Sequence, residues 1–182
     1  MGKVITSTYA TLDGFIDNPH LWSMQYANAE SGEYALGLLF AADALLLGRV
    51  TYDGMAQAWP SMSGNPYADR VNDIPKYVVS STLEKAEWNN STIIHGDDLV
   101  TEVAKLREQL DGNILIWGCG RLTDTLMEHG LLDEYRIWLY PVVRGQGERL
   151  FREGTEATLE LTDTATFDSG VVILTYQPAS AG

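Results

Sequence analysis

The chain has 182 residues, of which 45% are hydrophobic and 20% charged, and its formal net charge is −13. This length predicts one domain, spanning residues 1–182, that is large enough to bury its own core. The single cysteine excludes an intramolecular disulfide and every zinc site built on two or more cysteines, and we expect no metal. The strong negative charge disfavours binding to nucleic acids and to anionic membranes.

The sequence shows neither a signal peptide nor a membrane-spanning segment, so we expect a cytoplasmic protein. Residues 1–6 lack the long apolar core of a signal peptide and are expected to lead into a strand. The most apolar stretch, residues 35–48, is interrupted by Asp43 and is too short to cross a bilayer.

The first two-thirds of the chain alternates short apolar runs with helical patterns, which is typical of parallel β–α units. The run at residues 44–47 is apolar throughout, as expected of a strand buried on both faces of a sheet. We predict strands at residues 4–9, 44–47, 77–79, 92–94 and 114–117. We predict helices at about 30–42 and 49–59, a third that is capped by Asp97 or Asp98, has apolar positions from Leu99 to Leu110 and is closed by Gly112, and a fourth that carries Leu122 and Leu126 and is stopped by Gly130.

The last third has the character of antiparallel strands. Residues 135–143 form one long apolar strand, residues 158–162 alternate, and a turn at 168–170 leads into a strand at 171–176. The sequence therefore predicts an α/β fold whose central sheet is mixed, parallel with an antiparallel C-terminal part, and is flanked by helices.

Residues suited to phosphate binding follow the predicted strand at 44–47. Ligands of open α/β sheets sit at the carboxyl ends of strands. Gly48 lets the backbone approach a ligand, Arg49 adds a cation and Thr51 adds a hydroxyl. Taken alone, a tight turn with a surface arginine is an equally good interpretation.

A second junction has two glycines around a small residue, directly before a helix. Gly118 and Gly120 flank Cys119, and this arrangement suits a pyrophosphate. Thr123 stands where the dinucleotide-binding fingerprint has its third glycine, so a packing turn is about as good an interpretation. Cys119 is either a redox-sensitive thiol or simply a small residue tolerated beside a phosphate.

The third junction carries clustered hydroxyls after the strand at 77–79. Ser80 and Ser81 can hold an adenosine 2′-phosphate, and they can equally cap a turn.

These junctions and several other segments together resemble the dihydrofolate reductase-like superfamily. The resemblance is closer to the reductase domain of bacterial riboflavin biosynthesis and its stand-alone relatives. It extends in family order over nearly the whole chain. The segments that carry it are TLDGFI, LLLGRVTYDGMAQAWP, PKYVVSSTL, LIWGCGRLTDTLMEHGLLDEYRIWLYPVVRGQGERLF and SGVVILTYQP.

The resemblance implies an NADPH-dependent reductase that transfers hydride to a C=N-type acceptor, similar to 5-amino-6-(5-phosphoribosylamino)uracil reductase. It also implies a small heterocyclic substrate of the pterin, folate or ribosylaminopyrimidine type, and a homodimer. It assigns Gly48, Arg49 and Thr51 to the cofactor phosphates, Ser80 and Ser81 to the 2′-phosphate, and Gly118, Cys119, Gly120, Arg121 and Leu122 to the pyrophosphate. It assigns Leu12, Gly14, Phe15 and Ile16 to a loop that closes over the nicotinamide and the substrate.

The catalytic acid is less well defined, because the chain departs here from the dihydrofolate reductase pattern. Glu30 lies in the region of the acidic residue that bonds the pterin ring, but in no matching motif, and Asp13 is the other candidate. Dihydrofolate or pterin reduction is therefore an alternative, as is a non-catalytic NADPH-binding sensor or interaction module on the same fold. Arg70, Lys76 and Arg144 are available for a sugar phosphate, but the sequence does not place them.

Overall fold

The computed structural model describes residues 1–180, which divide into two compact units, each made of two stretches of chain. Unit 1 comprises Met1–Val4 and Tyr34–Trp117, and unit 2 comprises Ile5–Glu33 and the chain from Gly118 onward. The prediction of a single domain therefore stays a prediction. No helix within the described residues is long and apolar enough to cross a membrane.

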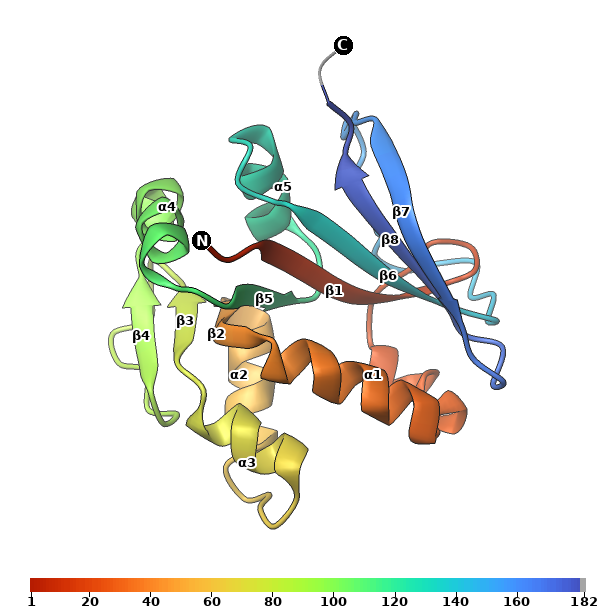
Figure 1. The fold of residues 1–182 in the computed structure, drawn as a ribbon, viewed down its shortest axis with the longest axis horizontal. Coiled ribbons are helices and arrows are strands. Elements are labelled where there is room, and N and C mark those ends of the chain that lie inside the picture. The colour runs from red at the N-terminus through yellow and green to blue at the C-terminus, as the bar shows by residue number, and fades with distance from the viewer. Residues whose placement is uncertain (181–182) are drawn as a thin grey trace. The chain divides into compact units, whose positions relative to one another are not determined.

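Unit 1 is built on four parallel strands in the order β4-β3-β2-β5 (Figure 1). Residues 44–47 of β2 are buried, which explains why the run carries no polar residue. The strands are β2 Ala42–Gly48, β3 Lys76–Val79, β4 Ser91–Ile94 and β5 Asn113–Trp117. The helices of this unit are α2 Arg49–Ala58, α3 Pro66–Asp73 and α4 Leu99–Gln109, with a 3-10 turn at Gly96–Asp98.

Unit 2 contains one parallel and two antiparallel strand pairs, in the order β1-β6-β8-β7 (Figure 1). The mixed sheet class predicted from the sequence is confirmed, because the antiparallel pairs are confined to the C-terminal strands. The strands are β1 Val4–Thr11, β6 Glu134–Tyr140, β7 Leu159–Thr166 and β8 Val172–Pro178. The helices are α5 Arg121–Glu128 and two 3-10 turns, Pro19–Leu21 and Met24–Tyr26, while α1 Ala29–Phe40 crosses the boundary between the units.

Two features differ from the sequence prediction. The strand expected at residues 135–143 ends at Tyr140, because Pro141 has no N–H for a ladder and the N–H of Val142 turns back to the carbonyl of Tyr140 (2.8 Å). Helix α3 was not predicted at all. Its start has the expected signals, since Pro66 occupies the first turn and the side chain of Asn65 accepts a hydrogen bond from the Ala68 N–H at 2.9 Å.

A buried lysine holds the C-terminal end of α3. The Lys76 ammonium donates to the carbonyls of Asn72, Ile74 and Asn89, each at 2.9 Å, and lies 4.5 Å from the centre of the Trp88 ring. Burial lowers the pKa of Lys76 from 10.5 to about 8, with the nearby Asp73 charge opposing the shift. Lys76 therefore has a structural role and is not available to a substrate phosphate.

We expect the Lys76→Met variant to lose about 2–3 kcal/mol of unfolding free energy, because buried carbonyls lose their donors. The folded chain binds this proton less tightly than the unfolded chain. The difference in unfolding free energy between the wild type and Lys76→Met should therefore increase as the pH rises from about 8 to 10.5. Urea denaturation at several pH values measures this difference in unfolding free energy. The control is Lys105→Met, which removes an exposed lysine. If this difference in unfolding free energy decreases over the same pH range, the hydrogen bonds to the carbonyls, and not burial, determine the pKa of Lys76.

Candidate functional site

The Arg49 side chain in unit 1 is held in one orientation at the carboxyl end of β2. Arg49 is the first residue of α2, and its Nε donates to both carboxylate oxygens of Asp53, one turn later, at 3.0 and 2.9 Å. Its Nη1 donates to the hydroxyls of Ser80 and Thr82 at 3.4 and 3.3 Å. The side chain remains 38% exposed, so the end of the guanidinium can still reach a ligand.

The hydroxyl cluster after β3 also forms a turn. Ser80 is buried, and its Oγ accepts hydrogen bonds from the backbone N–H groups of Thr82 and Leu83 at 3.2 and 3.0 Å. Ser80 therefore caps this turn, and its hydroxyl also accepts a hydrogen bond from Arg49. Thr82, the last hydroxyl of the predicted cluster, is hydrogen-bonded to Arg49, whereas no hydrogen bond joins the exposed Ser81 to Arg49 in the described chain.

The backbone beside this cluster leaves room for a ligand. A Cβ atom built on Gly48 would meet nothing within 4 Å, so packing does not require a glycine there. Thr51 lies in the first turn of α2 and is half-buried. A fixed cation, hydroxyls and a bare backbone segment at the ends of parallel strands fit a phosphate group.

The glycine loop of unit 2 follows a chain reversal at Gly118. Gly118 has a φ of +92°, which favours glycine, and its carbonyl accepts a hydrogen bond from the Thr6 hydroxyl. The N–H of Gly120 donates to Oγ1 of Thr123 at 2.9 Å, and that hydroxyl donates back to the Gly120 carbonyl at 2.9 Å. Thr123, in the place of a third glycine, therefore secures the start of α5. The predicted Arg121 and Leu122 form the first turn of this helix.

The Cys119 thiol is not poised for reaction. Its Sγ lies 3.3 Å from Oγ1 of Thr123 and donates to the Leu150 carbonyl at 3.5 Å. Burial raises the pKa of the Cys119 thiol, and the charge of Asp124 adds to the shift. The thiol is therefore protonated at neutral pH, which favours the interpretation of Cys119 as a small residue over that of a redox-sensitive one.

Arg152 is a cation near the glycine loop that sequence reasoning missed. A Cβ atom built on Gly120 would lie 3.4 Å from the Arg152 Nη2, although 32 positions separate the two residues in the chain. No sequence motif marks this contact, since it depends on the path of the chain after β6.

The predicted substrate loop, residues 11–16, is joined by hydrogen bonds to residues 142–150. The carboxylate of Asp17 also accepts from the N–H of Glu148 at 2.8 Å. The closing motion expected of this loop stays a prediction, and the predicted residues Leu12, Gly14, Phe15 and Ile16 all lie in the paired segment. The backbone pairs are Leu12 N–H to Val142 C=O, Ile16 N–H to Glu148 C=O and Leu150 N–H to Gly14 C=O, each at 2.8 Å, with a bridge between Phe15 and Arg149.

Asp13 ties this loop to its neighbour. Its carboxylate accepts hydrogen bonds from the Thr11 hydroxyl at 2.7 Å and from the N–H groups of Arg144 and Gly145 at 3.1 and 2.7 Å. The hydrogen bond from Thr11 is the main reason that the pKa of Asp13 is lowered. An ionised acceptor of this kind suits a role in holding the loop better than a role in donating a proton.

Glu30, the other candidate acid, lies at the start of α1. Its Oε2 accepts a hydrogen bond from the N–H of Asp168 at 2.9 Å, in the turn between β7 and β8. Glu30 and Asp13 thus both bind backbone N–H groups in unit 2.

An aromatic cluster lies at the carboxyl ends of β1 and β6. The Tyr9 ring lies 5.1 Å from those of Trp138 and Tyr140, and Trp22 and Tyr26 pack edge-on against Tyr140 at 5.3 and 5.8 Å. Burial raises the pKa of both Tyr9 and Tyr140. Neutral phenol groups beside aromatic faces suit the binding of a planar heterocycle.

Of the remaining basic residues, Arg70 is structural, since it donates to the Ala42 carbonyl at 2.6 Å and lies over the Phe40 ring.

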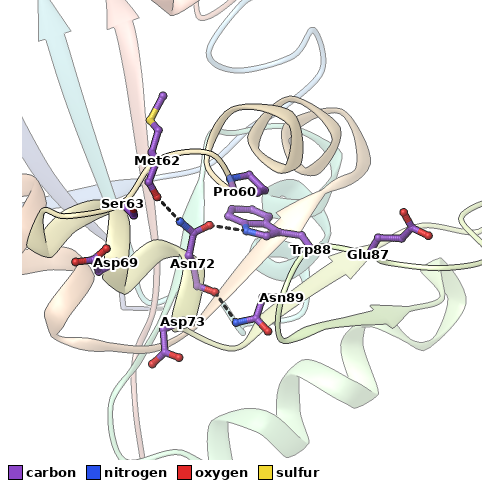
Figure 2. A pocket seen from close by; sticks show the side chains of 9 residues that line it. All are labelled: Pro60, Met62, Ser63, Asp69, Asn72, Asp73, Glu87, Trp88 and Asn89. Atoms are coloured by element: carbon purple, nitrogen blue, oxygen red, sulfur yellow. Dashed lines mark hydrogen bonds between the residues drawn. The ribbon is translucent and has the colours of Figure 1, made fainter.

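Unit 1 also has a pocket of about 400 Å³ near the end of α3, shown in Figure 2. The Asn72 amide links its walls by donating to the Met62 carbonyl and accepting from the Trp88 indole (Figure 2). The pocket contains none of the predicted site residues.

Solved structures with a similar backbone identify the fold. A putative riboflavin biosynthesis protein from Shewanella sp. PV-4 aligns with a TM-score of 0.75 at 22% identity, covering 98% of this chain and 99% of the other. Dihydrofolate reductase from Enterococcus faecalis, solved in complex with NADP(H), aligns with a TM-score of 0.68 at 16% identity and 98% coverage of both chains. The fold is that of the dihydrofolate reductase-like proteins.

The family follows from the sequence. Residues 2–173 match the RibD C-terminal domain, and the chain belongs to that family. The uncharacterized protein YyaP of Bacillus subtilis (strain 168) is 31% identical over 180 residues, which cover 96% of this chain and 94% of the relative.

Proposed function

We propose that this protein is an NADPH-dependent reductase that acts on a C=N bond of a ribosylaminopyrimidine-type substrate, as in riboflavin biosynthesis. The observation that carries the proposal is the Arg49 guanidinium, oriented by Asp53 and bonded to Ser80 and Thr82 at the carboxyl ends of β2 and β3. Membership of the RibD C-terminal domain family supports the reductase class.

The residues of each unit suit a different part of the cofactor. In unit 1, Arg49 and Thr82 would bind the 2′-phosphate that distinguishes NADPH from NADH, because a guanidinium binds phosphate through paired charge-assisted hydrogen bonds. In unit 2, Gly118 and Gly120 would let the backbone approach the pyrophosphate. NADPH, when bound, supplies a hydride from its dihydronicotinamide ring.

The residues of the protein would orient the acceptor and allow one proton to reach it. The half-buried rings of Tyr9 and Tyr26, which pack against the buried Tyr140, would hold a planar substrate. Asp13 would keep the loop at 11–16 in place, and a solvent water would then deliver the proton. Because Glu30 is bonded to the backbone of the β7–β8 turn, we favour a pyrimidine over dihydrofolate as substrate.

The role of Asp13 is testable in a reductase assay. We expect Asp13→Asn to lower kcat while leaving the pH dependence of kcat unchanged, because the amide cannot accept all the hydrogen bonds that hold the loop. Hydrogen exchange at the Arg144 and Gly145 amides should become faster in the same variant. If the acidic limb of the pH profile disappears instead, Asp13 is the proton donor.

The proposed function is tested by parallel calorimetric titrations with NADPH and NADH, followed by turnover with the ribosylaminopyrimidine and with dihydrofolate. Tight binding of NADPH with weaker binding of NADH, and oxidation of NADPH by the pyrimidine, is the expected result. Binding of NADPH without turnover of either substrate would favour a non-catalytic sensor on the same fold.

We also propose that the reductase is a cytoplasmic homodimer, and light scattering of the purified protein tests its assembly.

A further inference from the structure

The Arg152 side chain faces a part of the glycine loop where no side chain stands. Its Nη2 lies 3.4 Å from the position that a Cβ atom on Gly120 would occupy. Gly120 has a φ of 164°, an extended conformation that any residue adopts, and a Cβ at this distance would make an ordinary contact. Neither backbone conformation nor packing therefore requires glycine at position 120, and its bare face leaves space in front of a cation.

The guanidinium of Arg152 is available to bind a ligand. Its only ionic neighbour within residues 1–180 is Asp124, with Nε 3.8 Å from Oδ2, which is too long for a hydrogen bond. No oxygen of the described chain accepts a hydrogen bond from this guanidinium, and the side chain is 39% exposed. Asp124 thus partly balances the charge without occupying the donors.

The chemistry of this space is that of an anion site. A guanidinium with free donors beside exposed glycine backbone suits a phosphate or pyrophosphate, which takes two parallel hydrogen bonds from such a group. In a chain with a formal charge of −13, an anion is repelled by most of the surface, so a site for one needs a cation placed at that position.

We infer that Arg152 and Gly120 form a phosphate-binding site and that Arg152 is a ligand-binding residue of this protein. The phosphate group comes either from the pyrophosphate of the proposed cofactor or from the sugar phosphate of the proposed substrate, and in this respect the inference rests on the proposed function. The anion site itself can be probed with inorganic pyrophosphate, independently of that function.

The experiment compares the wild type, Arg152→Met, Arg152→Lys and the control Lys85→Met, which removes an exposed lysine of unit 1. Calorimetry with inorganic pyrophosphate should show about tenfold weaker binding in Arg152→Met, with Lys85→Met unchanged. Arg152→Lys should recover part of the affinity, because an ammonium keeps the charge but not the paired donors.

Two further arms identify the source of the phosphate. If Arg152→Met weakens NADPH and NADH by the same factor, the site holds the cofactor pyrophosphate common to both. If it instead raises only the KM for the phosphorylated substrate, the site holds the substrate phosphate. Pyrophosphate binding that depends on Arg152, in a wild type that binds neither nucleotide, would refute the proposed function and support the anion site. If the wild type and Arg152→Met have equal affinities for pyrophosphate, NADPH and NADH and equal KM values for the substrate, the inference is wrong.

Discussion

Replacement of Arg49 by methionine is expected to weaken the binding of NADPH about tenfold or more, because a charge-assisted phosphate contact contributes about 1.5–3 kcal/mol. NADH, which has no 2′-phosphate, should lose much less affinity. The structure supports this difference, since Nε of Arg49 is occupied by Asp53 and Nη1 points toward the hydroxyls of Ser80 and Thr82. The result is measured as the ratio of the two dissociation constants.

The loss of Arg49 also leaves the Asp53 carboxylate without its cation, so repulsion of the phosphate adds to the effect. The double variant Arg49→Met with Asp53→Asn separates the two contributions, and it should recover only the part caused by repulsion. Thr82→Val should lower the preference for NADPH more than Ser81→Ala, since Arg49 donates a hydrogen bond to Thr82 and none to Ser81 in the described chain. Equal weakening of NADPH and NADH by Arg49→Met would refute its assignment to the 2′-phosphate.

Gly120→Val is expected to reduce cofactor binding by at least a hundredfold while the protein stays folded. The new side chain finds room in the protein, because the nearest atom to its Cβ is the flexible end of Arg152 at 3.4 Å. Its methyl groups would occupy the space that we assign to the pyrophosphate. Affinity is measured by calorimetry with NADPH, and folding by circular dichroism and thermal melting.

The matched control for this substitution is Gly37→Val, since a Cβ on Gly37 in α1 would meet nothing within 4 Å and would likewise cause no clash. Its cofactor affinity should equal that of the wild type. Unchanged affinity in Gly120→Val would mean that the glycine loop has only a structural role.

Local sequence patterns predicted most of the fold. The apolar runs at residues 44–47 and 114–117 lie in β2 and β5, and the alternating residues at 158–162 begin to form β7. Burial on both faces leaves a continuous apolar run, as in β2, whereas β7, whose residues are mostly exposed, has no such run. Helix α3 escaped prediction because it is short and polar, with only Ala68 and Val71 buried.

The candidate site was predicted less completely. Strand–glycine–helix junctions are local, so Gly48, Arg49, Gly118 and Gly120 could be selected from the sequence as candidates. The contact of Thr82 with Arg49 joins residues 33 positions apart, and the approach of Arg152 to Gly120 joins residues 32 apart. Nothing in the neighbouring residues encodes such contacts.

The sequence by itself determined the class of the fold, the order of its strands and of its helices other than α3 along the chain, and the junctions where a phosphate could bind. These follow from periodicity and backbone preference, which act over a few residues. Only the tertiary structure decided the roles of individual side chains: that Asp13 accepts backbone hydrogen bonds, that Lys76 is buried beneath Trp88, and that Arg152 lies beside the glycine loop. The physical reason is that charge, burial and hydrogen bonding depend on neighbours in space, and folding selects those neighbours from distant parts of the chain.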